Sequence, residues 1–250
     1  VPISFMIYSS LVVNYVSGFS FSNFSLKNYR LLFSISSIKM SITNSITYAI
    51  ITVVLCAILS IIYAYFKWKK RFNISISLLE KATSISYSLP GMVFALCMIF
   101  HWAKPIPGLN IGFYASPIII LIAYVSRFLI IDMKSAYQGF SSISTSLEYA
   151  ADLSNGSKLK KWTKIFLPLI YRYILTSSLL IFVYSLSELS LSAILSGPFT
   201  KTIGLFIFNL QQSGDYNLAY AMSTLVLIVL LIMYIIIEKI NAGGKNELKN

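Results

Sequence analysis

Charged side chains are scarce in this sequence: they make up 11% of its 250 residues, whereas 57% of the residues are hydrophobic and the mean hydropathy is +0.76. A soluble domain of this length cannot bury so much apolar surface. The scarcity of charge therefore excludes an ordinary soluble globular protein. It predicts a polytopic membrane protein whose apolar segments face lipid or one another.

Residues that carry catalysis or hold metals are also few, with one histidine, two cysteines and eight acidic residues. His101 lies beside Trp102 at the end of an apolar run, which is typical of an interfacial anchor. Cys56 and Cys97 lie inside apolar runs without a CxxC pattern, so they are expected to pack as small hydrophobic residues. The sequence contains no HExxH and no GxxxxGK[ST] motif. We therefore expect no catalytic residue, no metal site and no cofactor in this chain, and no ATP hydrolysis by the chain itself.

Basic residues outnumber acidic ones, and the formal net charge is +12. In a soluble protein such an excess favours nucleic-acid binding, but here the lysines and arginines cluster between apolar runs. No arginine-rich patch with interleaved aromatic residues is present. The excess therefore indicates membrane orientation, and we expect no nucleic-acid partner.

The apolar runs predict an all-α integral membrane protein, with residues 1–250 forming one domain of about six transmembrane helices. The expected spans are residues 3–20, 43–66, 83–103, 113–131, 169–193 and 218–237. Between and beyond them we expect a surface helix within 21–42, a loop or short helix over 72–82, a loop over 194–217 and a loosely ordered polar tail over 238–250.

With six spans both termini lie on one side of the membrane, together with the loop between spans four and five. That side carries fourteen of the lysines and arginines and the other side carries five, with Arg127 left inside the membrane. Cytoplasmic loops carry the excess of basic residues. The predicted location is thus a cell membrane, with the N- and C-termini and the central loop in the cytoplasm.

The central loop contains the longest polar segment, YAADLSNGSKLKKWTKIFLP over residues 149–168. Thr145 and Glu148 have the spacing of a capping box, and Asn155-Gly156 predicts a turn. A second, basic amphipathic helix follows, and Pro168 is expected to bend or restart it. The segment could be an ordinary positively charged loop, or it could be a docking element whose small residues let another protein approach the backbone.

The spacing of this segment resembles the EAA loop of bacterial ABC-transporter permeases, the membrane subunits of binding-protein-dependent importers. Ala150, Ala151, Ile165, Leu167 and Pro168 fall in register with the pattern Glu-Ala-Ala, three residues, Gly, nine residues, Ile-x-Leu-Pro. The chain departs from it at two positions, where Tyr149 replaces the glutamate and Asn155 replaces the glycine. Glu148 stands one residue early and Gly156 one residue late.

This resemblance implies that a coupling loop over residues 136–168 docks on cytoplasmic ATP-binding subunits. The residues that it implicates in docking are Leu147, Glu148, Ala150, Ala151, Asn155, Gly156, Ile165, Leu167 and Pro168. ATP would be bound by those partner subunits and not by this chain.

Three polar or helix-breaking features inside the spans bear on a translocation path. An unpaired Glu188 inside span five is costly, so we expect it to face a cavity or a partner. Pro90-Gly91 interrupts span three and is interpreted either as a packing kink or as a bend that lines the path. Arg127 lies near the cytoplasmic end of its span, where snorkelling is the simplest interpretation, and its spacing from Asp132 disfavours an ion pair on a regular helix.

The resemblance to these permeases extends over most of the chain. Asn44-Ser45, the SLPG at 88–91 and Arg127 are similar to features of the family, and the run from Glu188 through Gly197-Pro198 to Gly204 resembles the iron(III) branch. Members of that branch often fuse two six-span halves, and this chain resembles a second half. The expected function is import of a small solute, most simply iron(III), with thiamine, putrescine, sulfate and aminoethylphosphonate as alternatives within the broader family.

The partners implied by the resemblance are ATP-binding subunits, an extracytoplasmic solute-binding protein, a second permease half or copy, and the lipid membrane. An alternative from another class is a channel or structural membrane protein without an ATPase. A membrane-embedded enzyme is disfavoured because the residues for catalysis are missing from the sequence.

Overall fold

The computed structural model describes residues 2–12, 23–102, 104, 112–144, 146–147 and 158–247. Within these ranges the regular structure is helical, apart from one isolated bridge between Val12 and Phe24. The helices are α1 (Pro2–Leu11), α2 (Lys27–Ser34), α3 (Ser36–Trp68), α4 (Asn73–Ser88), α5 (Gly91–Trp102), α6 (Pro117–Ser141), α8 (Lys158–Lys161), a π-helical segment Trp162–Phe166, α9 (Leu167–Ser187), α10 (Ser190–Leu195), α11 (Ile203–Gln212) and α12 (Tyr216–Glu247).

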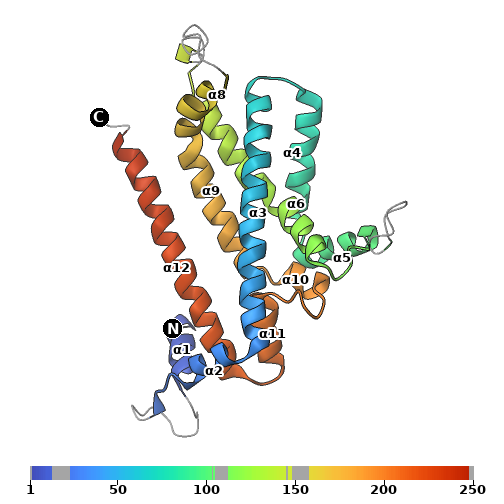
Figure 1. Cartoon of the computed structure of the whole chain (residues 1–250), viewed down its shortest axis with the longest axis vertical. Coiled ribbons are helices and arrows are strands. Elements are labelled where there is room, and N and C mark those ends of the chain that lie inside the picture. The colour runs from blue at the N-terminus through green and yellow to red at the C-terminus, as the bar shows by residue number, and fades with distance from the viewer. Residues whose placement is uncertain are drawn as a thin grey trace.

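Helices α3, α4, α6, α9 and α12 run along the long axis of the molecule (Figure 1). Helix α6 packs against α3, α9 and α4, so it occupies the centre of the bundle. Its side chains Tyr124, Met133 and Phe140 are among the largest that are fully buried. The hydrophobic core therefore sits around α6, while the outer faces of α3 and α12 remain apolar and exposed, as expected for helices that contact lipid.

Three helical segments are long and apolar enough to cross a membrane: Ser36–Trp68, Trp162–Ser187 and Tyr216–Ile240. A fourth is possible if the bent pair α4 and α5 counts as one span. These segments confirm that the runs predicted over 43–66, 169–193 and 218–237 form long apolar helices. The first and last residues of the helices differ from the predicted ones. Helix α6 corresponds to the predicted fourth span but carries Arg127, Asp132 and Lys134, so it does not meet the same criterion.

Two of the predicted spans are not single continuous helices in the described residues. The run over 3–20 contains the ten-residue helix α1, which ends at Leu11 and is shorter than the roughly 20 residues that a transmembrane helix needs, and residues 13–20 lie outside the described ranges. The run over 83–103 is divided between α4 and α5, which are bent by 119° at Leu89-Pro90. The extended backbone before the proline ends α4 because the residue before a proline avoids the helical conformation.

Two predicted irregular segments are helical instead. The loop expected over 194–217 contains α11, which begins after Thr202, whose side chain accepts a hydrogen bond from the Leu205 N–H at 3.5 Å. The tail expected over 238–250 is helical as far as Glu247, because α12 continues beyond its apolar stretch. Conversely, the short amphipathic helix expected within 21–42 is confirmed by α2, and its location at a membrane surface stays a prediction.

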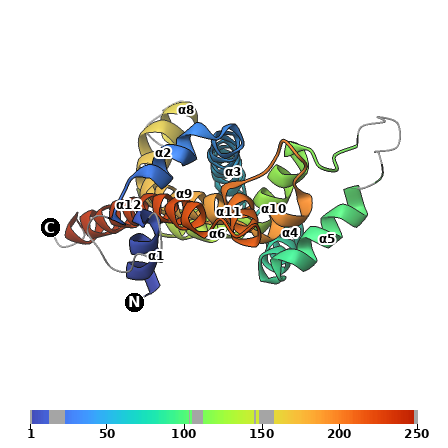
Figure 2. The ribbon, with the colours of Figure 1, turned by 90° about the horizontal axis from the view of Figure 1, so that it is seen from below.

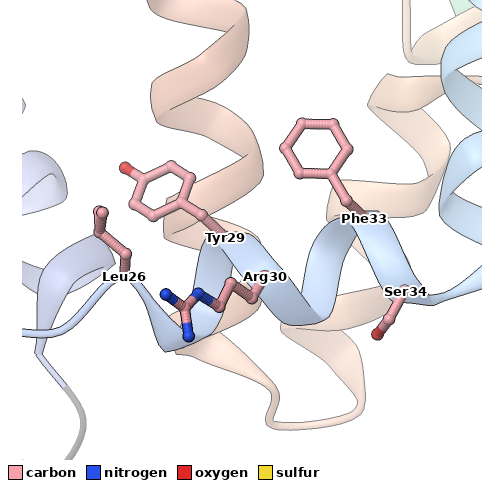
Figure 3. Close-up of a pocket in the computed structure, with 5 residues that line it drawn as sticks. All are labelled: Leu26, Tyr29, Arg30, Phe33 and Ser34. Carbon is pink, nitrogen blue, oxygen red and sulfur yellow. The ribbon is translucent and has the colours of Figure 1, made fainter.

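Helix α2 lies across the bundle at the end opposite α8, together with α1, α10 and α11 (Figures 1 and 2). Leu32 is its buried anchor, whereas Leu26, Phe33 and Arg30 are exposed. A shallow pocket follows its exposed side and is lined by Leu26, Tyr29, Arg30, Phe33 and Ser34 (Figure 3). Such a combination of apolar and basic side chains is typical of a helix at a membrane surface.

Candidate functional site: the coupling-loop end and the broken-helix junction

The predicted coupling loop lies between α6 and α8 in the sequence, and α8 lies at the end of the bundle opposite α2 (Figure 1). Of the residues expected to dock, Glu148, Ala150, Ala151, Asn155 and Gly156 lie outside the described residues, as does Thr145 of the expected capping box. Leu147 is described and 42% exposed. The docking face itself therefore stays a prediction, whereas the base of the loop can be described in detail.

At the base of the loop, Ile165, Leu167 and Pro168 follow one another on a continuous helix. The Leu167 N–H bonds to the carbonyl of Trp162, five residues earlier, which makes a π-helical turn. Pro168 lies in the first turn of α9, where its missing N–H is tolerated. The helix expected to bend or restart at Pro168 instead continues through it, after a widened turn of the kind that often marks functional sites.

Five aromatic side chains join the base of the coupling loop to two neighbouring helices. Tyr65 and Trp68 come from α3, Phe140 from α6, and Trp162 and Phe166 from the π-helical segment. The ring centroids of Tyr65 and Trp162 are 5.0 Å apart, and those of Phe140 and Phe166 are 5.8 Å apart. We call these five residues the aromatic cluster. It ties both ends of the loop to α3, because edge-on aromatic contacts add to the gain from burial.

The carboxylate of Glu188 lies at a break between two helices and not inside a continuous span. Helix α9 ends at Ser187, and the Glu188 backbone is extended. Its Oε1 accepts a hydrogen bond from the Leu191 N–H at 3.1 Å, and its carbonyl accepts one from Ser192 Oγ at 3.0 Å. Glu188 thus caps the first turn of α10, which explains how a half-buried carboxylate is accommodated there.

The break at Pro90-Gly91 meets the break at Glu188. A Cβ atom on Gly91 would lie 2.6 Å from Ser190 Cβ and 3.7 Å from Glu188 Oε1. A Cβ atom on Gly204 of α11 would lie 3.0 Å from the Glu188 carbonyl oxygen. Both glycines are needed for this close approach, because any side chain would push the backbones apart. We call Gly91, Glu188, Ser190 and Gly204 the broken-helix junction.

The start of α3 holds the segment that leads into α11. Asn44 Nδ2 donates hydrogen bonds to the carbonyls of Phe199 and Lys201, at 2.9 and 3.0 Å. Ser45 Oγ accepts one from the Ile203 N–H at 2.8 Å. These bonds satisfy backbone groups that no helix would otherwise satisfy. The Asn44-Ser45 pair therefore fixes the position of α11, and through Gly204 the position of the junction.

Arg127 also supports the junction, which corrects its interpretation as a snorkelling residue. Its Nη1 donates a hydrogen bond to the Leu89 carbonyl at 3.0 Å, immediately before Pro90. The guanidinium thereby satisfies a carbonyl at the end of α4, where the extended backbone of Leu89 stops the helix and leaves that carbonyl without a helical partner. Among the described residues no ion pair joins Arg127 to Asp132.

Replacing Arg127 by glutamine is expected to lower the stability of the chain by about 1.5–3 kcal/mol, the usual contribution of a hydrogen bond to a charged group. The measurement is the unfolding midpoint of the purified protein in mild detergent. Arg30→Gln serves as the control, because Arg30 is exposed on α2. Equal midpoints for Arg127→Gln and Arg30→Gln would contradict the role given to Arg127.

Within the described ranges, no group of three or more His, Cys, Asp or Glu side chains is placed to hold a metal ion. Cys56 is buried and Cys97 exposed, and neither takes part in a disulfide. The described residues at the two candidate sites make aromatic packing contacts, cap a helix and bring helix backbones close together. Among the described residues at these sites, no nucleophilic side chain lies beside a general base.

Comparison with known proteins agrees with this architecture. The family model described as "Binding-protein-dependent transport system inner membrane component" matches residues 77–242. One chain in the crystal structure of a bacterial alginate ABC transporter, in complex with an alginate pentasaccharide-bound periplasmic protein, superimposes with a TM-score of 0.73. It is 15% identical, and the match covers 94% of this chain and 85% of that one. At this identity the likeness shows the fold alone.

Among curated proteins, the ferric transport system permease protein FbpB of Actinobacillus pleuropneumoniae is 28% identical over 90% of this chain. The spermidine/putrescine permease PotC of Haemophilus influenzae is 25% identical over 89% of this chain and 84% of its own length. The match covers 32% of the ferric permease, so this chain spans about a third of that relative.

The matched region includes most of α4, all of α5 and α6, the predicted coupling loop, the broken-helix junction and most of α12. It amounts to more than half of the chain. The protein therefore belongs to the family of binding-protein-dependent transport system inner membrane components.

Proposed function

We propose that the chain is the permease part of an ATP-driven importer that moves a small solute from an extracytoplasmic binding protein into the cytoplasm. As a family member it is a non-catalytic, multi-pass component of the inner membrane. The observation that carries the proposal is the family match, which spans both the coupling-loop end and the broken-helix junction.

The coupling-loop end supports the docking of separate ATP-binding subunits. Leu147 is exposed, and the aromatic cluster anchors both ends of the loop to α3. A force applied to the loop would reach α6 and α9 directly, because those helices flank it. We assign docking to Leu147, Glu148, Ala150, Ala151, Asn155 and Gly156, and support of the loop to Ile165, Leu167 and Pro168, within a coupling region over residues 136–168.

The broken-helix junction supports a translocation path at the other end of α9. Non-helical backbone at membrane depth is tolerated where it is buried in protein or lines a cavity. We assign Pro90, Gly91 and Glu188 to the lining of the path. The Leu191 N–H donates a hydrogen bond to the carboxylate of Glu188 and holds it in place. The fixed negative charge of this carboxylate would favour a cationic solute.

The most specific substrate that we propose is iron(III). Two ferric permease relatives support it, at 28% identity over 90% and 29% identity over 73% of this chain. A polyamine is the second candidate, because the PotC relatives match over 84% and 80% of their own lengths. Thiamine, sulfate and aminoethylphosphonate importers are further members of the broader family that the sequence resembles.

The charge distribution supports an orientation. Lys67 lies in the last turn of α3 and Lys69 and Lys70 follow it, at the end of α3 beside α8, whereas Lys27 and Arg30 lie on α2 at the opposite end. The α8 end and the C-terminal end of α12 would therefore be cytoplasmic. A cytoplasmic N-terminus had been expected from a first span over 3–20, which α1 is too short to form.

The remaining partners follow from this orientation. A loaded binding protein would contact the end that carries α10 and α11, and a second permease half or copy would complete the path. The described part of the chain exposes apolar side chains of α4 and α5, such as Leu78, Met92 and Phe100, to which lipid or that second half could pack.

Uptake of radioactive iron(III) and of radioactive putrescine, in cells with and without the intact transport system, tests the function and the substrate together. We expect the loss of this chain to abolish iron(III) uptake and to leave putrescine uptake unchanged. Loss of putrescine uptake alone would move the assignment to the polyamine branch. Unchanged uptake of both cations, and of the other family solutes, would contradict an importer.

A further inference from the structure

Asp132 is a buried carboxyl group to which the proposed function gives no role. It lies on α6, at the centre of the bundle, and its exposed fraction is 0%. Its Oδ1 atom has no hydrogen-bond partner among the described residues. Its Oδ2 atom is 3.5 Å from Ser178 Oγ on α9, which is a long distance for a hydrogen bond to an ionised carboxylate.

Within the described ranges, no lysine or arginine nitrogen lies within 4.0 Å of the Asp132 carboxyl oxygens. Among the described residues the ion pair within 4.0 Å is that between Lys67 and Glu80, so no cation pairs with Asp132. The groups that face it are the buried thiol of Cys56 on α3 and the hydroxyls of Ser177 and Ser178 on α9. An ionised carboxylate in such a place costs several kcal/mol, because neither water nor a counter-ion compensates for its charge.

Helices α6 and α9 approach each other closely along the face that carries Asp132. Ser135 Oγ donates a hydrogen bond to the Tyr173 carbonyl at 2.7 Å. One turn further along, a Cβ atom on Gly139 would lie 3.0 Å from the Tyr173 ring and 3.3 Å from Ile170. Asp132, Ser135 and Gly139 thus form one stripe against α9, which we call the α6–α9 seam. The seam lies on the two helices that flank the predicted coupling loop.

We propose that Asp132 is a proton-binding site, and that the bound proton closes the α6–α9 seam. In the closed seam the carboxyl is neutral, its Oδ2 accepts the hydrogen bond from Ser178 Oγ, and no charge is buried. When the proton leaves, it passes to water, and the carboxylate that remains needs solvent. Release of the proton therefore requires α6 and α9 to part, so that proton binding and closure of the seam are linked.

Infrared spectroscopy of the full chain in lipid nanodiscs detects the proton directly. A protonated carboxyl has a carbonyl stretching band that an ionised carboxylate lacks. At mildly acidic pH we expect this band in the wild-type protein and its complete loss in Asp132→Asn, which keeps the shape and remains neutral. Asp215→Asn is the matched control, because Asp215 is exposed at the other end of the bundle. It should leave the band unchanged.

A second variant keeps the test valid if Asp132→Asn does not fold. Ser178→Ala removes the hydroxyl nearest to the carboxyl and should shift the band in frequency, because the strength of its hydrogen bond sets the position of the stretch. Absence of the band from the wild-type protein, or a band that both variants leave unchanged, would overturn the proposal. This readout does not depend on transport, so it can fail while the importer assignment stands.

Discussion

Replacing Ala151 by glutamate should abolish solute uptake while leaving the protein in the membrane. Ala151 lies in the predicted docking segment, where a small side chain lets an ATP-binding subunit approach the backbone. An unpaired charge buried in an interface costs about 3–5 kcal/mol, which corresponds to a loss of affinity of more than about a hundredfold. The measurements are uptake in cells, membrane content by immunoblot, and co-purification of the ATP-binding subunit.

Asn73→Asp is the control for the added charge. Asn73 is exposed at the start of α4, outside the coupling region over residues 136–168 and away from the end that carries α10 and α11. We expect normal uptake and normal recovery of the ATP-binding subunit with that variant. Normal uptake together with stable ATPase association in Ala151→Glu would eliminate the docking assignment.

Replacing Gly91 by alanine should disrupt the broken-helix junction. The new Cβ atom would lie 2.6 Å from Ser190 Cβ, so the two helix breaks would have to separate. Overpacking of this kind costs about 1–3 kcal/mol. If the junction lines the path, the displacement also reaches Glu188, and uptake should fall more than stability alone would explain. The unfolding midpoint in detergent and the uptake rate per molecule in the membrane separate the two effects.

Gly112→Ala is the matched control, because no heavy atom lies within 4 Å of a Cβ at that position. It should change neither the midpoint nor the uptake rate. If Gly91→Ala behaves like Gly112→Ala, the close approach at the junction has no consequence. If Gly91→Ala lowers the midpoint but leaves uptake per molecule unchanged, the junction is structural and does not line the path.

The sequence predicts the long helices of this fold well, because a continuous apolar run of about 20 residues is typical of a membrane-spanning helix. The run around residues 43–66 becomes α3 and the run over 218–237 becomes most of α12. It predicts the breaks poorly. Pro90-Gly91 indicated a kink within one span, but the bend is 119°, since Arg127 satisfies the Leu89 carbonyl and permits a sharp turn. That contact joins residues 38 apart, and local patterns do not show it.

Helix α11 could have been found from the sequence. Thr202 is a good N-cap residue, and Ile203, Phe206, Ile207 and Leu210 recur at helical spacing. The Gly197-Pro198 and Gly214-Asp215 pairs on either side favoured a loop instead. By contrast, the environment of Glu188 could not have been predicted, because its location at a helix break depends on Gly91 and Gly204, which are distant in the sequence.

For the candidate site, too, local sequence patterns predicted some features, whereas contacts between distant residues were not predicted. The spacing of Ala150, Ala151, Ile165, Leu167 and Pro168 indicated the family, and the family match over 77–242 confirms it. The aromatic cluster was not predicted, since Tyr65, Trp68, Phe140, Trp162 and Phe166 come from three separate segments and each alone is typical of a membrane interface. Contacts across the fold, and not composition, brought them together.

Purification of the tagged protein in gentle detergent, with mass spectrometry of the proteins that accompany it, tests the central claim most directly. The account predicts a stoichiometric ATP-binding subunit, together with a solute-binding protein of the iron type. A different binding protein with the same ATPase would keep the importer and change the substrate. The absence of any ATPase, under conditions in which a known importer retains its own, would contradict the account and favour a channel or structural protein.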